Sequence, residues 1–188
     1  MTAASDAAVS AGSTSVGFVG LGNVGSKLAE SVMRNGFDLA VHDLDPGLVA
    51  AFVERGAAAT GSPRALAEQC DVVITCLPNP AASASVVEGA DGLLHGWSDG
   101  KVWLEMSTTD ESEITRLGAL VSAAGGAPVD CPVSGGCHRA ATGNISIFAG
   151  CERATFDRVL PLLTVLGRRV LHTGPLGSAS ILKVATNY

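Results

Sequence analysis

The sequence lacks three features that mark common classes of protein: a long apolar run, a basic cluster and a metal-ligand motif. No stretch approaches the roughly 20 apolar residues that a membrane-spanning helix needs, so we expect no membrane insertion. The net charge of −6 at pH 7 comes from scattered acidic residues without a cluster of Lys or Arg. Such a chain has no positively charged surface for phosphates, which argues against nucleic acid as a partner.

The cysteines and histidines show no spacing typical of a disulfide framework or a metal site. The five cysteines are odd in number, show no Cys-x-x-Cys spacing and have apolar or glycine-rich neighbours. We therefore expect reduced thiols in or near the core rather than disulfides. No histidine approaches another histidine or a cysteine at metal-ligand spacing, so no metal is expected. The residues concerned are Cys70, Cys76, Cys131, Cys137 and Cys151, and His42, His95, His138 and His172.

Residues 1–15 form a small, polar segment rich in Ala and Ser. The segment has neither the basic start and apolar centre of a secretory signal nor the arginines of a transit peptide. We therefore expect a disordered leader and a cytoplasmic protein. The rest of the chain, within a sequence that is 47% hydrophobic, is long enough to bury one core and is read as one domain.

Apolar runs of strand length alternate with helical patterns along the chain. Asp45-Pro46 and Ser62-Pro63 each supply a helix cap followed by proline at the first helical position. Strands that are apolar on both faces and alternate with helices predict a doubly wound α/β domain with a mainly parallel sheet. The expected strands are 16–19, 39–42, 71–76, 102–104, 127–130, 145–149 and 169–172.

The last third of the chain carries two further signals. Pro161 interrupts a periodic run from 152 to 166, which predicts a kink or two short helices. A final helical pattern opens near Ser178 and continues to the last residue, Tyr188. A helix of about three turns with nothing to pack against is marginal. We therefore read residues 178–188 as the start of a truncated helix at a domain boundary, and residues 16–177 as the domain itself.

A glycine-rich turn follows the first expected strand. Gly20, Gly22 and Gly25 form Gly-x-Gly-x-x-Gly directly before a helical pattern. In a dinucleotide-binding turn the first glycine permits the tight bend, the second removes the Cβ that would block a pyrophosphate, and the third lets helix and strand approach. The position within a βαβ unit meets the context that this motif requires. The predicted cofactor-binding turn comprises Gly20, Leu21, Gly22, Asn23, Val24 and Gly25.

Asp43 ends the second expected strand, 23 residues after Gly20. An acidic residue near this spacing accepts hydrogen bonds from the adenosine ribose and repels a 2′-phosphate. No arginine within residues 42–46 relieves that repulsion, so we predict NAD rather than NADP. The alternative, that the carboxylate caps the next helix, fits Asp45 better.

With these motifs and four later blocks, the chain resembles the 3-hydroxyisobutyrate dehydrogenase family of β-hydroxyacid dehydrogenases over residues 16–188. The resemblance implies that Leu77 and Pro78, in the block that follows the fourth strand of that family, line the adenosine side of the cofactor. Thr108, in the block Glu105-Met106-Ser107-Thr108-Thr109, then lies near the nicotinamide end. Read without the family, Thr109 or Asp110 caps the following helix, and both interpretations can hold together.

Another block, Asp130-Cys131-Pro132-Val133-Ser134-Gly135-Gly136, is close to the substrate-binding signature of that family. Backbone N–H groups of Gly135 and Gly136 can converge on an anion, with the Ser134 hydroxyl as a further donor, which suits a substrate carboxylate. Without the resemblance, Ser-Gly-Gly reads as a turn. His138 and Arg139 either tune the choice of substrate or face solvent, and solvent is slightly favoured.

The last block places Lys183 and Asn187 four residues apart, on one face of a helix. The resemblance implies that Lys183 is the catalytic general acid/base and Asn187 its partner, in hydride transfer between NAD and a short β-hydroxyacid. A lone lysine on a helix is more often a solvated charge. As a base the amine must be neutral near the operating pH, which burial and the positive nicotinamide both favour.

The family also has an all-helical second domain that closes the substrate cleft and makes most subunit contacts. The resemblance therefore implies a homo-oligomer when that domain is present, and poor turnover without it. The rival interpretations are an imine reductase-like or 6-phosphogluconate dehydrogenase-like enzyme and a non-catalytic NAD sensor or remnant. Lys183 argues against the imine reductase, and retention of the last two blocks argues against the sensor. The identity of the hydroxyacid stays open among 3-hydroxyisobutyrate, glycerate from tartronate semialdehyde, and threonate-like polyols.

Overall fold

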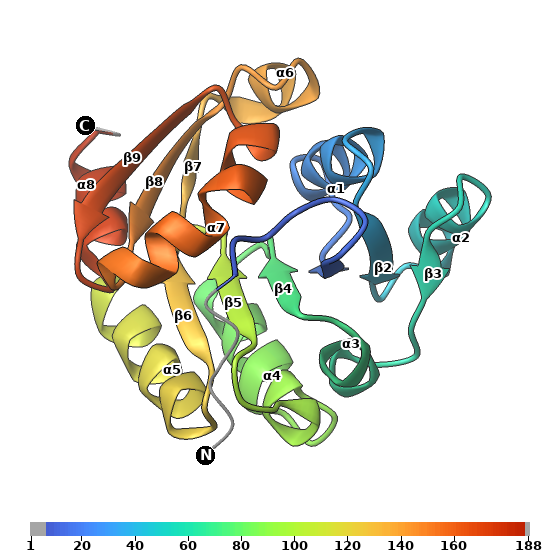
Figure 1. Cartoon of the computed structure of the whole chain (residues 1–188), viewed down its shortest axis with the longest axis horizontal. Helices are drawn as coiled ribbons and strands as arrows, with labels where there is room; N and C mark the ends of the chain where they lie inside the picture. The colour runs from blue at the N-terminus through green and yellow to red at the C-terminus, as the bar shows by residue number, and fades with distance from the viewer. Residues whose placement is uncertain (1–6, 187–188) are drawn as a thin grey trace.

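We describe the protein from a computed structural model, in which residues 7–186 are placed. This part of the chain forms one nine-stranded sheet with helices on both sides (Figure 1). In chain order the elements are β1 (Ser15–Val19), α1 (Gly25–Arg34), β2 (Asp38–His42), α2 (Pro46–Val53), β3 (Ala58–Ala59), α3 (Pro63–Gln69), β4 (Val72–Thr75), α4 (Pro80–Glu88), the 3-10 turn η1 (Leu93–Gly96), β5 (Val102–Glu105), α5 (Glu111–Ala123), β6 (Ala127–Asp130), β7 (Val133–Ser134), α6 (Gly136–Ala141), β8 (Ser146–Gly150), α7 (Arg153–Leu166), β9 (Arg169–Gly174) and α8 (Ser178–Ala185).

The strands follow the order β3-β2-β1-β4-β5-β6-β8-β7, with β9 paired to β8. Strands β3 through β6 in that order are parallel, whereas β8 is antiparallel to β6 and β7. The predicted doubly wound, mainly parallel α/β fold is confirmed, and it is Rossmann-like. The order of strands reverses between β1 and β4. In such sheets ligands bind at that point, outside the carboxyl ends of the strands.

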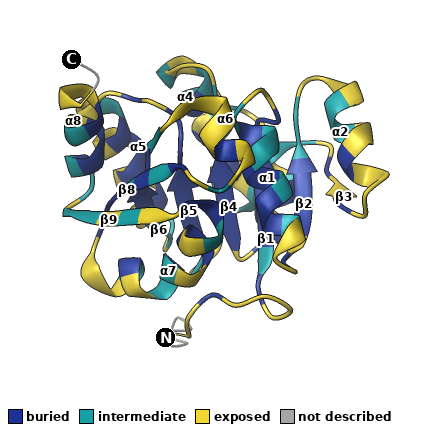
Figure 2. Cartoon of the chain, turned by 90° about the horizontal axis from the view of Figure 1, so that it is seen from above, coloured by how far each residue is buried: buried dark blue, intermediate teal, exposed yellow. Residues whose placement is uncertain are grey.

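The two faces of the sheet carry separate apolar clusters. Helices α1 and α7 cover one face through side chains such as Leu28 and Val159, and α3 and α5 cover the other through Leu66 and Leu117. Figure 1 shows α1 and α7 on one side of the sheet and α3, α4 and α5 on the other. The central strands are dark blue along their length in Figure 2 because both of their faces are buried. Their continuous apolar runs follow from this double coverage.

The predicted disordered leader is wrong for residues 7–15 as far as the structure describes them. Val9 is 3% exposed and packs into the cluster that includes α7. Its backbone N–H donates to the Arg158 carbonyl at 2.9 Å, and Ser15 already belongs to β1. One valine in a polar segment carries no periodic signal, so only the packing shows that it is buried.

The region around Pro161 forms one helix, α7, with the proline inside it. The alternative of two short helices is therefore wrong. Phe156, Val159, Leu162 and Leu163 are all buried along this helix. We infer that their burial on the sheet compensates for the hydrogen bond that a proline removes from a helix interior.

Three short elements, β3, β7 and α6, were not predicted because each is only two to six residues long. These elements differ in their relation to the predicted site. Strand β3 ends the sheet beyond β2, whereas β7 and α6 carry the Ser134-Gly135-Gly136 segment. The predicted helix caps at Asp45 and Ser62 are confirmed, since each side chain accepts a backbone N–H of its helix.

Candidate functional site

The glycine turn lies between β1 and α1, and each of its three glycines has a distinct environment. Gly20 has a φ of 96°, and a Cβ there would lie 2.3 Å from the Cys76 carbonyl oxygen. A Cβ on Gly25 would lie 1.9 Å from the Gly20 carbonyl oxygen, so helix and turn touch through this position. A Cβ on Gly22 would meet nothing within 4 Å. Gly22 therefore faces open space, as a residue beneath a pyrophosphate must.

Asp43 holds this turn from the end of β2. Its Oδ2 accepts the Leu21 N–H at 2.6 Å, and its Oδ1 accepts the Asp45 N–H at 2.9 Å. Asp45 in turn accepts the Gly47 N–H at 2.8 Å and is the cap of α2. The two acidic residues thus have separate tasks, and capping is the task of Asp45. Asp43 is half-buried and lines the cavity described next.

A cavity of about 800 Å³ opens at the carboxyl ends of β1, β2 and β4. Its volume lies in the range of small-molecule and cofactor sites. All but one of the positions predicted to bind the cofactor line it: Gly20, Gly22, Asn23, Val24, Gly25, Asp43, Leu77, Pro78 and Thr108. The exception is Leu21, whose side chain is 1% exposed in the core while its N–H binds Asp43.

Under this cavity a chain of hydrogen bonds links the ends of β4 and β5. The Glu105 carboxylate accepts the Ser107 N–H at 2.8 Å, and the Ser107 hydroxyl accepts the Leu77 N–H at 2.7 Å. Both bonds are buried or half-buried. Glu105 therefore orients the two loops that carry Leu77 and Thr108. Sequence reasoning placed Glu105 in a block and assigned it no role, because only the register brings it under the cavity.

Glu105 is completely buried, and burial raises the pKa of its carboxyl above the ordinary value of 4.5. Ser107, Ser83 and Thr75, whose polar groups face this carboxyl, act in the opposite direction. Among the described residues, however, none makes a hydrogen bond of good geometry to Oε2. A protonated Glu105 avoids the cost of a buried, half-satisfied carboxylate.

We expect the Glu105→Gln variant to become increasingly more stable than the wild type as the pH rises above about 4.5. In the wild type the unfolded state loses its proton there while the folded state keeps it, so stability falls with pH until the raised folded pKa is passed. Glutamine has no proton to lose. The measurement is the free energy of unfolding by urea between pH 4 and pH 8.

The matched control is Glu113→Gln, because Arg116 lowers the pKa of Glu113. That variant should lose stability at neutral pH and approach the wild type as the pH falls below the ordinary value of 4.5. A Glu105→Gln protein whose stability stays parallel to the wild type at every pH contradicts the assignment.

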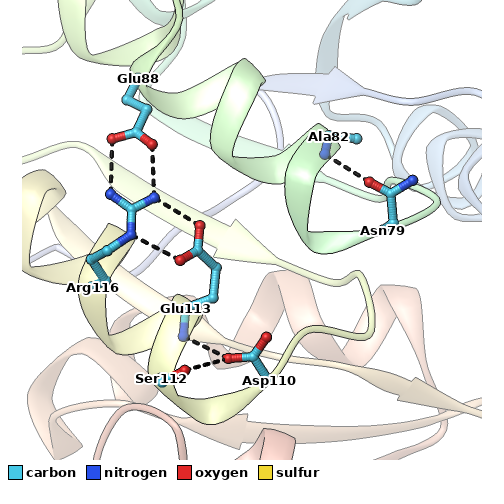
Figure 3. Close-up of polar contacts among 7 residues, drawn as sticks. All are labelled: Asn79, Ala82, Glu88, Asp110, Ser112, Glu113 and Arg116. Atoms are coloured by element: carbon cyan, nitrogen blue, oxygen red, sulfur yellow. Dashed lines mark hydrogen bonds and ion pairs between the residues drawn. The ribbon is translucent and has the colours of Figure 1, made fainter.

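Helix α4, which lies along the cavity, is held at both ends (Figure 3). At its start the Asn79 side chain accepts the Ala82 N–H at 2.9 Å. At its end Glu88 receives two hydrogen bonds, of 2.9 and 2.7 Å, from Arg116 on α5. Arg116 also binds Glu113 with two bonds, so one guanidinium joins α4 to α5. Of the two caps predicted for α5, Thr109 or Asp110, the cap is Asp110, which accepts the Glu113 N–H.

The Ser134-Gly135-Gly136 segment passes from β7 into α6. Ser134 is half-buried, and the two glycines are exposed with φ values of 137° and 69°. Val133 lines the cavity, but none of these three residues does. The segment therefore borders the cavity rather than forming its wall. His138 and Arg139 are exposed, as favoured above.

Lys183 lies in α8, which begins at the same edge of the sheet as the glycine turn. The last residues of β1, β4, β5 and β6 are paired from each strand to the next: Val19 with Thr75, Thr75 with Glu105, and Glu105 with Asp130. The first of them precedes Gly20, and the last binds the first turn of α8. In Figure 2, α8 lies at the opposite end of the sheet from the N-terminal segment.

The Lys183 side chain is largely buried, with 8% of the residue exposed. Burial lowers the pKa of its amine below the ordinary value of 10.5, which is the direction expected for a general base. Lys183 does not line the cavity itself. Asn187, its predicted partner, lies outside the described residues.

Residues 7–186 contain neither a metal-binding cluster nor a membrane-spanning helix. No group of three or more His, Cys, Asp or Glu residues in that range could hold a metal ion. In the same range, no helix has the length and apolar character to cross a membrane. The five cysteines are free thiols; Cys70, Cys131 and Cys151 are buried, Cys76 is half-buried and Cys137 is exposed.

The reversal of strand order, the glycine turn and Asp43 together define a nicotinamide-dinucleotide-binding domain. The chain belongs to the family described as the NAD binding domain of 6-phosphogluconate dehydrogenase, whose model matches residues 15–174.

Individual relatives show which enzymes of this family the chain resembles. The rat mitochondrial 3-hydroxyisobutyrate dehydrogenase (Rattus norvegicus) is 35% identical over 177 residues, 94% of this chain and 53% of that protein. The 2-(hydroxymethyl)glutarate dehydrogenase of Eubacterium barkeri is 32% identical over 93% of this chain and 58% of that protein. A solved 3-hydroxyisobutyrate dehydrogenase from Salmonella typhimurium superposes with a TM-score of 0.86 at 30% identity, covering 92% of this chain and 61% of that one.

The resemblance to the 3-hydroxyisobutyrate dehydrogenase type is thereby confirmed for the cofactor-binding domain. The chain spans about half the length of the curated relatives it matches.

Proposed function

We propose that this chain binds NAD and carries the proton-transfer residue for hydride exchange between NAD and a short β-hydroxyacid. The observation that supports this most is the row of strand ends from Val19 to Asp130. The row joins the glycine turn at one end to the helix of Lys183 at the other. A cofactor lying outside this edge would extend from the turn toward the lysine.

The residues present fit a dinucleotide. Gly22 has the open space that a pyrophosphate needs, whereas a side chain there would fill it. The cavity is about 800 Å³, with Asp43 on the side of β2 and Thr108 beyond the end of β5. In this proposal Asp43 and the Leu77-Pro78 pair hold the adenosine half, and Thr108 lies near the nicotinamide. When bound, the nicotinamide supplies the acceptor for the hydride.

The substrate site is proposed at Ser134, Gly135 and Gly136. The exposed backbone of the two glycines and the Ser134 hydroxyl offer donors to a carboxylate beside Val133, which lines the cavity. A carboxylate bound there would hold the substrate beside the cofactor cavity, and positioning of this kind accounts for much of an enzyme's rate.

Lys183 is proposed to accept the hydroxyl proton at Nζ during oxidation and to return it during reduction. Its burial supports this because a buried amine loses its proton more readily. Asn187, four residues after Lys183 in the sequence, is proposed to hold the amine in line.

The preference for NAD over NADP is part of the proposal. A 2′-phosphate 4 Å from the Asp43 carboxylate meets a repulsion of about 4 kcal/mol per charge pair at an effective dielectric of about 20. The next residue, Leu44, is 95% exposed and lines the cavity without offering a charge to a phosphate. Asp43 is moreover held in place by the Leu21 and Asp45 N–H groups.

The test is a panel of short β-hydroxyacids, including 3-hydroxyisobutyrate and glycerate, with NAD⁺ or NADP⁺ and absorbance of the reduced cofactor as readout. We expect NAD⁺ to give at least about tenfold higher kcat/KM, since about 1.4 kcal/mol of the repulsion above suffices for that ratio. The chain is assayed alone and fused after Tyr188 to the carboxyl-terminal half of the rat relative.

Equal kcat/KM with both cofactors would remove the preference for NAD. Tight NAD binding without turnover in the chain or the fusion would favour the non-catalytic sensor. Turnover in the fusion alone would show that residues of the added half complete the substrate cleft.

A further inference from the structure

Helix α8, which carries Lys183, has no capping side chain of its own. Its N-cap residue is Gly177, with a φ of 90° and no side chain to accept a hydrogen bond. The first turn of a helix leaves N–H groups that need acceptors, and a helix without a cap is less stable and less exactly placed. The acceptor for α8 must therefore come from elsewhere in the fold.

Asp130, at the end of β6, supplies it. Its Oδ2 accepts the Ser180 N–H at 2.8 Å, and its Oδ1 accepts the Ser180 hydroxyl at 2.8 Å. The two residues are 50 positions apart, and both are buried. A carboxylate at a helix N-terminus also interacts favourably with the helix dipole. Asp130 thus acts as the cap of a helix to which it does not belong.

Asp130 is itself fixed in position. It pairs with Glu105 on β5 and with Gly150 on β8, so strands lie on both sides of it. Burial raises the pKa of its carboxyl, while hydrogen bonds from Ser180 and from the N–H groups of Gly177 and Ala179 act in the opposite direction. The interactions with α8 therefore help to keep the buried group charged.

The geometry of α8 passes this constraint to the lysine. Ser180 and Lys183 are three residues apart, so both side chains project from the same face of the helix. That face is buried: Ser180 is 2% exposed and Lys183 8%, whereas Ile181 is 59% exposed. Fixing Ser180 therefore fixes the height and rotation of Lys183, about 4.5 Å further along the helix axis.

We propose that Asp130 is a positioning residue for the reaction: by holding Ser180 it sets where the Lys183 amine meets the substrate. Because Asp130 also lies four residues before Ser134, one buried carboxylate relates the lysine to the substrate-binding segment. This inference rests on the proposed function and adds to it a residue that contacts neither substrate nor cofactor.

The test compares Asp130→Ala, Asp130→Asn and Ser180→Ala with a matched control, Asp71→Ala. Asp71 also accepts the N–H and the hydroxyl of one serine, Ser15, at 2.9 and 2.8 Å. It stands before β4, at the amino end of the sheet and away from α8. The control therefore removes the same kinds of hydrogen bond without touching the lysine helix.

Asp130→Ala is expected to lower kcat on the order of 100-fold, the cost of a displacement of about 1 Å in a catalytic group. Asparagine has one acceptor oxygen instead of two, so Asp130→Asn should lower kcat on the order of tenfold. Because Asp130 does not line the cavity, the Kd for NAD should stay within about twofold of the wild-type value in both variants. A tenfold change would correspond to about 1.4 kcal/mol of binding energy. Asp71→Ala should keep kcat within about twofold, with only general stability affected.

Two readouts need no activity. Hydrogen exchange of the α8 amides should accelerate at least about tenfold in the Asp130 variants and not in Asp71→Ala. An amine-reactive acylating reagent should also modify Lys183 faster in those variants, because the amine gains access to solvent; mass spectrometry measures the rate of modification. If Asp130→Ala does not fold, Asp130→Asn and Ser180→Ala provide the comparison.

Wild-type-like exchange, labelling and kcat in the Asp130 variants would overturn the positioning role. An equal response to Asp71→Ala would overturn it as well, because the effect would then be one of overall stability. A wild type that oxidises no hydroxyacid would refute the proposed function instead, and exchange and labelling would still decide whether Asp130 holds the lysine.

Discussion

Lys183→Met is expected to lower kcat for hydroxyacid oxidation by roughly 100- to 10,000-fold, the usual contribution of a general acid/base. The Kd for NAD should change by less than about twofold, because Lys183 does not line the cavity. Methionine keeps the length and apolar body of the side chain without the amine. Steady-state kinetics and cofactor fluorescence titration measure the two quantities separately.

The pH dependence provides a second measure of the same assignment. Oxidation requires the neutral amine, so kcat should rise with pH and level off above the pKa of Lys183. Since burial lowers that pKa, the midpoint should lie below the ordinary value of 10.5. The reduction direction should show the opposite trend, because there the protonated amine is the reactive form.

Lys101→Met is the matched control. Burial also lowers the pKa of Lys101, which directly precedes β5. Its side chain, however, donates to the Ala67 and Glu68 carbonyls at the end of α3. We expect lower stability and an unchanged kcat. A loss of kcat in Lys101→Met as large as that in Lys183→Met, or near-normal kcat in Lys183→Met, would refute the assignment of Lys183.

Gly22→Val is expected to weaken NAD binding by at least about 100-fold, or about 2.8 kcal/mol, while the protein stays folded. A Cβ at this position meets no protein atom within 4 Å, so the added side chain enters the open space above the turn. A pyrophosphate bound to the turn would occupy that space. Isothermal titration with NAD and thermal unfolding measure binding and stability separately.

Two other glycines provide the controls. A Cβ on Gly61 likewise meets nothing within 4 Å, but Gly61 is not part of the cavity lining, so Gly61→Val should leave NAD binding unchanged. Gly25→Val should instead impair folding, because its Cβ would lie 1.9 Å from the Gly20 carbonyl oxygen. Normal NAD affinity in a folded Gly22→Val protein would show that the dinucleotide does not cross this turn.

Much of the cofactor site could be predicted because its signals are local. The glycine spacing, the acidic residue after β2 and the proline-preceded helix starts each occupy a few consecutive residues, and the structure places them as expected. The expected disorder around Val9 and the alternative of two short helices at Pro161 were wrong for the opposite reason. The burial of Val9 depends on contact with α7, about 150 residues further along the chain, and the continuity of α7 accompanies the burial of its side chains on the sheet.

By itself, therefore, the sequence determined the α/β class, the glycine turn and the position of Asp43, since periodicity and turn chemistry act over short distances along the chain. Leu77, Pro78 and Thr108, which also line the cavity, were instead implied by the resemblance to the family. Only the tertiary structure decided the tasks of Glu105 and Asp130. Each carboxylate takes its role from the register of the strands and from partners reached across the sheet edge, and a contact between Asp130 and Ser180 has no local signature over 50 residues. The sheet also decided that Lys183 is buried, because desolvation depends on what packs around a side chain rather than on its neighbours in sequence.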